Sequence, residues 1–159
     1  MFFNHLRIYL LAIFFILSSS SLIGQTSSDF QNKFEAANRL NDLKQFELAK
    51  EIWVELAKDY PNNANINFKT GYCLLNTTFD KKEALKYLDK AEQNIAAKYS
   101  PIDYNVTNAP LETHYYLAKA YHHNYDLDSA IKYYKYFQNQ VSSKHFLQEE
   151  IPSDLEQCE

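Results

Sequence analysis

Three stretches of this chain repeat one pattern: residues 36–56 read AANRLNDLKQFELAKEIWVEL, residues 71–91 read GYCLLNTTFDKKEALKYLDKA, and residues 117–137 read LAKAYHHNYDLDSAIKYYKYF. In each stretch a small residue precedes a second small residue by 12 or 13 positions, and a large apolar residue follows four positions later. The small pairs are Ala37 with Ala49, Gly71 with Ala84, and Ala118 with Ala130. This pattern predicts two closely packed amphipathic helices per copy. Such units stack because none can bury its apolar face alone, and the resulting arrays mostly bind other proteins.

The distance between the copies matches a known repeat length. Ala37 and Gly71 are 34 residues apart, whereas Gly71 and Ala118 are 47 residues apart. A period near 34 is that of the tetratricopeptide repeat, a helix-turn-helix unit. The additional residues of the second interval lie between Ala91 and Leu111.

We therefore expect an all-α fold of three helix-turn-helix units in a short right-handed solenoid. The units would occupy about residues 30–63, 64–97 and 111–141, with an insert loop at 98–110. The insert contains Pro and Asn, which favour loops, and its large apolar residues can pack against the helices. These apolar residues are Tyr99, Ile102, Tyr104 and Val106.

Several residues mark where the expected helices begin and end. Asn63 and Asp126 can accept hydrogen bonds from the first turns of the helices that follow them. Asp80 and Glu83 together are close to a capping box. Pro61 ends a helix, since proline disfavours helical geometry in the residue before it.

The last repeat has its own signals. Asn108 and Pro110 are expected to start the fifth helix, with proline near the first helical position. Residues 142–159 predict a final, unfinished helix that caps the last repeat, and Pro152 would kink or restart it. The apolar face of this helix would consist of Phe146, Leu147, Ile151 and Leu155.

Gly71 lies inside an expected helix, where glycine costs about 1 kcal/mol relative to alanine. We therefore expect a packing reason for it, namely a partner helix that passes too close to leave room for a Cβ.

The first residues have the form of an export signal. A short segment with Arg7 precedes an uninterrupted apolar run at 8–17, and small polar residues then lead to a cleavage position after Gly24. A run of ten residues is shorter than the roughly 20 that a membrane span needs. We predict a signal peptide at 1–24 and a short linker at 25–29, with a retained anchor extending through Ile23 as the alternative.

Composition excludes some classes of partner. Without residues 1–24 the chain has 15 basic and 20 acidic side chains, so its net charge is near −5. A mildly acidic domain without a basic stripe argues against nucleic acid and against an anionic membrane surface as partners. The whole chain has two Gly and four Pro, which suits helices joined by short turns.

No catalytic, cofactor or metal site is expected. His122 and His123 are adjacent, so on a helix they point about 100° apart and do not converge on one metal ion. No glycine loop is present that could hold a phosphate. Cys73 and Cys158 are either two buried, weakly polar side chains or, in an oxidising compartment, a disulfide.

The expected functional surface is the concave face made by the first helix of each repeat. Amide side chains there can hold the backbone of an extended peptide, and aromatic side chains can anchor its side chains. The alternative is that the aromatic residues cover the groove floor or meet a following domain. The predicted groove residues are Phe34, Asn38, Asn41, Phe68, Tyr72, Leu75, Asn76, Tyr115, Lys119 and His122.

The three units resemble tetratricopeptide repeats over about residues 30–141. Ala36 and Ala37 stand where the family usually has Leu-Gly, and the basic-plus-Asn clamp that some members use for C-terminal carboxylates is not evident. The residues that occupy the family's signature places are Ala37, Ala49, Pro61, Gly71, Ala84, Ala91, Leu117, Ala118, Tyr121 and Ala130.

A narrower resemblance rests on residues 71–76, 80–84 and 109–122. These stretches are similar to the N-terminal repeat domain of envelope proteins in which a WD-repeat-like β-propeller and an OmpA-like domain follow. The PorE-type component of type IX secretion is one of them. The resemblance implies an exported, non-enzymatic docking domain at the periplasmic or outer-membrane side of a Gram-negative cell. Its partner would be a protein of an outer-membrane or secretion assembly, and any membrane association would go through a larger protein.

Two other functions remain open from the sequence. The repeats could be a structural spacer that packs against downstream domains of a longer chain. They could also be an accessory domain of a larger enzyme.

Overall fold

The computed structural model describes residues 28–158. The expected signal peptide at 1–24 lies outside these residues. The chain divides after Lys33 into two compact units, and the helix pairs and the groove belong to the second unit. Residues 28–33 of the first unit are helical. Ser28 and Asp29 were expected in a linker and are part of a helix instead. The Asp29 carboxylate pairs with Lys33 at 2.9 Å, one helical turn further on, which suits a position inside a helix.

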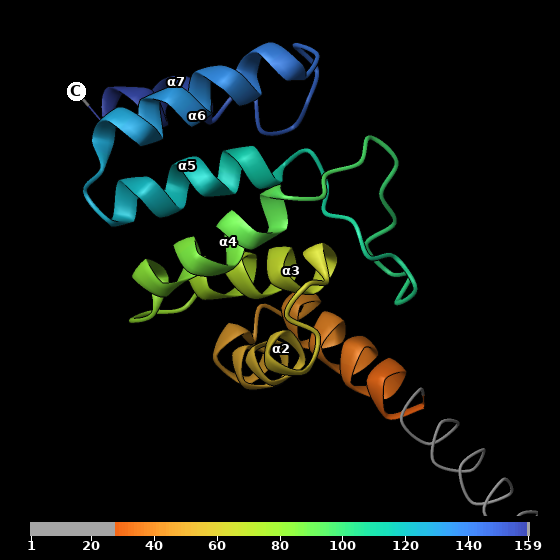
Figure 1. Cartoon of the computed structure of the whole chain (residues 1–159). Coiled ribbons are helices and arrows are strands. Elements are labelled where there is room, and N and C mark those ends of the chain that lie inside the picture. The colour runs from red at the N-terminus through yellow and green to blue at the C-terminus, as the bar shows by residue number, and fades with distance from the viewer. Residues whose placement is uncertain (1–27, 159) are drawn as a thin grey trace, which may run out of the picture. The chain divides into compact units, whose positions relative to one another are not determined.

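The regular structure of the described residues is helical, which is consistent with a helical-repeat fold (Figure 1). Each helix packs against the next one along the chain, from α2 on α3 to α6 on α7. An isolated bridge joins Ile95 to Ala109. Residues 34–42 are helical, and the later elements are α2 (Phe46–Asp59), α3 (Ala64–Leu75), a 3-10 turn (Lys81–Glu83), α4 (Ala84–Glu92), α5 (Thr113–His123), α6 (Leu127–Gln140) and α7 (Ile151–Glu156). Between residues 28 and 158, no helix combines the length and apolar character needed to cross a membrane.

The repeated pattern forms the core, as predicted. Its small alanines and the large residues four positions after the second of them have no exposed surface: Ala37, Ala49, Trp53, Ala84, Leu88, Ala118, Ala130 and Tyr134. The packing reason expected for Gly71 is confirmed, because a Cβ there would lie 2.8 Å from Leu88 Cδ2. The small residues thus let the two helices of a pair approach each other.

Two of the three predicted caps are confirmed. Asn63 accepts a hydrogen bond from the backbone N–H of Ile66, and Asp126 accepts one from that of Ser129, each at 3.1 Å. Asp80 does not cap its helix, because its carboxylate pairs with Lys50 of α2 instead. The ion pair with Lys50, which belongs to the preceding helix pair, has replaced the expected bond to the backbone of the first turn.

The C-terminal segment differs from the single helix expected over 142–159. Helix α7 covers only Ile151–Glu156, and Pro152 stands in its first turn, which is the restart that its position allowed. The Gln148 side chain donates to the carbonyl of Gln138 at 3.0 Å, which holds the preceding turns against α6. Leu147, Ile151 and Cys158 are buried. Phe146 was expected on the apolar face, but it is 68% exposed.

The insert at 98–110 is ordered, as predicted, but through polar as well as apolar contacts. The Tyr99 hydroxyl donates to Asn65 Oδ1 at 2.7 Å, and Asn65 Nδ2 donates to the Val106 carbonyl at 3.0 Å. Ile102 was expected to pack and is 78% exposed instead. Helix α5 begins at Thr113, later than Asn108 and Pro110 indicated.

Both cysteines are free and buried. The Cys73 thiol donates to the carbonyl of Phe46, and burial raises its pKa to about 12. The structure therefore agrees with buried thiols, and the disulfide alternative does not hold.

Candidate partner-binding groove

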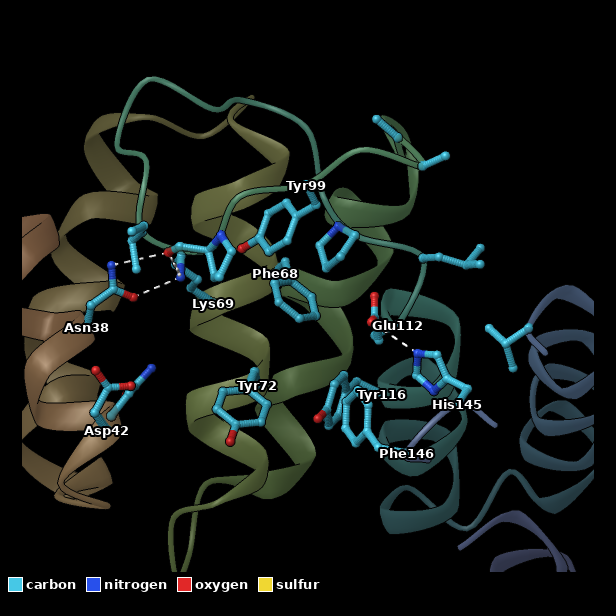
Figure 2. A pocket seen from close by; sticks show the side chains of 18 residues that line it. Asn38, Asp42, Phe68, Lys69, Tyr72, Tyr99, Glu112, Tyr116, His145 and Phe146 are labelled. Atoms are coloured by element: carbon cyan, nitrogen blue, oxygen red, sulfur yellow. Dashed lines mark hydrogen bonds and ion pairs between the residues drawn. The ribbon is translucent and has the colours of Figure 1, made fainter. Parts of the chain in front are cut away.

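A groove of about 750 Å³ lies across the helix pairs (Figure 2). It is lined by residues of the helical segment 34–42, of α3, of the insert, of the segment before α5 and α5 itself, and of the segment after α6. A smaller hollow of about 250 Å³ shares three of its residues: Tyr72, Tyr116 and Phe146. The larger groove is lined by Asn38, Asn41, Asp42, Phe68, Lys69, Tyr72, Ala96, Ala97, Tyr99, Pro101, Ile102, Pro110, Leu111, Glu112, Tyr116, Val141, His145 and Phe146.

The floor of the groove is aromatic. Phe68 and Tyr72 are four residues apart and so lie on one face of α3, with ring centroids 6.4 Å apart. Tyr116 of α5 meets Tyr72 edge-on at 5.1 Å, and Tyr99 of the insert meets Phe68 at 6.0 Å. Pairs in these geometries contribute about 0.5–1.5 kcal/mol each beyond their burial. The floor therefore joins both later repeats to the insert.

Two hydroxyl groups on this floor have no hydrogen-bond partner among the described residues, those of Tyr72 and Tyr116. Burial raises the pKa of both phenols, and neighbouring negative groups raise it further. Both phenols are therefore neutral at physiological pH, and each can donate to a carbonyl of a bound chain.

One end of the groove contains a buried lysine. Lys69 is 6% exposed, and its ammonium group donates to Asn38 Oδ1 and to the Pro101 carbonyl, each at 2.8 Å. It lies 5.2 Å from the ring centre of Phe34 and 5.5 Å from that of Trp53. Burial lowers the pKa of Lys69 to about 8, against the opposing charge of Asp42. The lysine thus ties the insert to two helices.

The other end of the groove is formed by His145 and Glu112. The His145 ring accepts a hydrogen bond at Nδ1 from the backbone of Leu147, so in the neutral ring Nε2 carries the proton. That nitrogen lies 3.2 Å from Glu112 Oε1, to which it donates. Phe146 stacks on the same ring at 4.6 Å. These contacts fix the segment after α6 as one wall of the groove.

The smaller hollow ends at a cluster that joins α5 to α7. The Tyr115 hydroxyl lies 2.7 Å from Glu150 Oε2 and 2.8 Å from Asp154 Oδ2. Lys119 donates to the same hydroxyl at 3.2 Å. Each group in this cluster has a partner, so its evident role is to hold the C-terminal helix in place.

The structure brings most of the predicted groove residues together. Asn38, Asn41, Phe68 and Tyr72 line the larger groove. Tyr72 also lines the smaller hollow, together with Leu75, Asn76, Tyr115 and Lys119. Of these, Leu75 and Tyr115 are buried to 7% and 1% exposure and belong mainly to the core.

Two predicted residues lie elsewhere. Phe34 is fully buried and meets Trp53 edge-on at 5.4 Å, so it packs within the repeat. His122 lines neither hollow, whereas the adjacent His123 lines the smaller one. One residue along a helix turns the side chain by about 100°, which is enough to move it out of the groove.

Sequence reasoning missed several groove residues. Tyr116 belongs to the same helix turn as the predicted Tyr115, so the spacing of the floor aromatics could have found it. The groove residues outside the helices follow no helical period, so helical spacing could not have predicted that they line the groove. The missed residues that matter most are Asp42, Lys69, Tyr99, Glu112, Tyr116, His145 and Phe146.

The comparisons with known proteins assign no family. No protein-family model matches this chain, and a search of curated proteins finds no match. The fold and the groove therefore define the class to which the chain can be assigned, an all-helical protein consistent with a helical repeat.

Proposed function

We propose that this chain is a non-catalytic interaction module of the tetratricopeptide-repeat type, whose groove holds an extended segment of a partner protein. The observation that carries the proposal is the groove floor. Aromatic faces from α3 and α5 line an open hollow, and the hydroxyls of Tyr72 and Tyr116 have no partner there. The volume of about 750 Å³ lies within the range of known ligand sites, roughly 300–1,000 Å³.

The finer parts of the proposal rest on the sequence. The helix pairs form a right-handed solenoid of repeats, and the pattern of residues 1–24 directs the chain out of the cytoplasm. The partner is then a protein of the cell envelope, in an outer-membrane or secretion assembly, as the resemblance implies.

A structural spacer is the second candidate, and one observation favours it. Ile102 and Phe146 line the groove and are 78% and 68% exposed, so a following domain of a longer chain could cover them. The two functions differ in what they require: a spacer needs the exposed residues at the rim, whereas a docking module needs the floor.

Affinity capture tests the docking function. The full chain is immobilised, and an extract of the source cells is applied to wild type, Tyr72→Ala and Tyr116→Ala. Truncating an aromatic anchor at an interface costs about 2 kcal/mol or more, roughly a 30-fold loss of affinity. Both variants are therefore expected to lose the partner that wild type retains.

Phe79→Ala is the matched control, because Phe79 is 89% exposed and lines neither hollow. Circular dichroism and urea unfolding verify that each variant folds. Unchanged recovery in both floor variants, with folding intact, would rule out the groove as the docking site.

A further inference from the structure

The larger groove is lined by one lysine and two carboxylates, Lys69, Asp42 and Glu112. The Glu112 carboxylate is already bonded to His145. Lys69 is 6% exposed and directs two of its N–H groups to Asn38 and Pro101. Two of the three N–H groups of Lys69 are therefore used within the protein.

Asp42 is the reachable charge. It ends the helical residues 34–42, its side chain is exposed, and its carboxylate has no hydrogen bond or ion pair with any described residue. Asn41, next to it, also lines the groove, but its Oδ1 atom is buried and a ligand does not reach it. The Asp42 carboxylate is therefore the hydrogen-bond acceptor that this end of the groove offers to a ligand.

The nearest aromatic residue of the floor is on α3. Asp42 and Tyr72 both line the groove, the charge of Asp42 acts on the Tyr72 phenol, and Figure 2 shows Tyr72 between Asp42 and Tyr116. A carboxylate next to an aromatic face favours a cation that can stack and donate at the same time. The guanidinium group fits best, because it is planar, has five N–H donors and no acceptor, and binds carboxylates in a bidentate fashion.

We propose that this end of the groove binds an arginine side chain of an extended partner segment, with the guanidinium over Tyr72 and its N–H groups on Asp42. The inference rests on the proposed docking function and names the chemistry of the segment that docks. The exposed apolar side chains of Ile102 and Phe146 at the groove receive the apolar residues of the same segment.

Fluorescence anisotropy with labelled synthetic peptides tests the inference on the full chain. The peptides are capped heptamers in which Leu alternates with Arg, citrulline, Lys or Glu. Citrulline keeps the shape of arginine without its charge. The Arg peptide is expected to bind at least about tenfold more tightly than the citrulline peptide, which is the effect of one lost charge-assisted hydrogen-bond pair. The Lys peptide is expected to fall between them, because an ammonium group cannot bind in a bidentate fashion.

Asp42→Asn is the decisive variant, since it keeps the shape of the side chain and removes only its charge. It should reduce the affinity for the Arg peptide to that for the citrulline peptide. Asp59→Asn, at an exposed position on α2 outside both hollows, should leave the preference unchanged.

Any other ranking overturns the inference: equal binding of the Arg and citrulline peptides, tighter binding of the Glu peptide, binding of none of them, or an Arg preference that survives Asp42→Asn. The proposed function has a separate outcome. If partner capture depends on Tyr72 but not on Asp42, the groove docks a partner without arginine. If it depends on neither, the docking function itself fails.

Discussion

Gly71 shows how one atom can decide the packing of a helix pair. Leu88 has no exposed surface and lies in a cluster with Leu74 and Leu117, so it has no room to move away from an added Cβ. Gly71→Ala gains about 1 kcal/mol of helix propensity, but overpacking costs about 1–3 kcal/mol. We expect a net loss of up to about 2 kcal/mol in the free energy of unfolding, measured in urea.

The control for Gly71→Ala is the same change in a Leu88→Ala background, where the space is open. There the substitution should be neutral or stabilising. A loss of the same size in both backgrounds would mean that Leu88 is not the cause.

The buried Lys69 makes the free energy of unfolding depend on pH. Burial lowers its pKa to about 8 from an ordinary 10.5. Below pH 8 the Lys69 amine is protonated in both the folded and the unfolded state. Between pH 8 and pH 10.5 it is protonated in the unfolded state alone. The free energy of unfolding therefore rises with pH in this window, because the unfolded state binds more protons.

Lys69→Met removes this effect. The stability of wild type relative to the variant should increase by about 1.5 kcal/mol between pH 8 and about pH 9.5. The buried tyrosines are common to both proteins, so their ionisation cancels in the difference. Urea unfolding at the two pH values measures it, and a difference that does not change with pH would contradict the buried-lysine account.

At the scale of the helices, α7 holds the last helix pair closed. Ile151 is fully buried among Tyr115, Tyr134 and Phe137, which belong to α5 and α6. Ile151→Ala is therefore expected to cost about 2–5 kcal/mol of unfolding free energy. Glu156→Ala, at an exposed position of the same short helix, should change it by less than about 0.5 kcal/mol. Equal effects of the two substitutions would mean that α7 does not pack as described.

The helices themselves could be predicted from the sequence, because local signals specify them. The spacing of small and large residues identified α2 to α6, and Asn63 and Asp126 marked two helix starts. The failures came where a distant residue replaced a local partner. Asp80 pairs with Lys50 instead of capping its helix, and the turns at 142–150 are fixed by α6 and α5.

At the scale of the whole molecule, the groove combines parts with different predictability. Tyr72 and Phe68 follow from helical spacing, and they form the floor. Phe34 lies on the same helix face as Asn38 but is buried against Trp53, and His122 lies one residue before His123, which lines the smaller hollow. The walls at Pro101 and His145 depend on how the insert and the C-terminal segment fold back, which requires long-range contacts that no local pattern contains.

The proposed docking function requires that the groove floor meets a partner protein. Site-specific photo-crosslinking in the source cells tests it most directly, with p-benzoylphenylalanine in place of Tyr72 and, in a parallel chain, of Phe79. A discrete crosslinked adduct is expected from position 72 and none from position 79. Adducts from position 79 alone, or equally from both positions, would contradict the docking function.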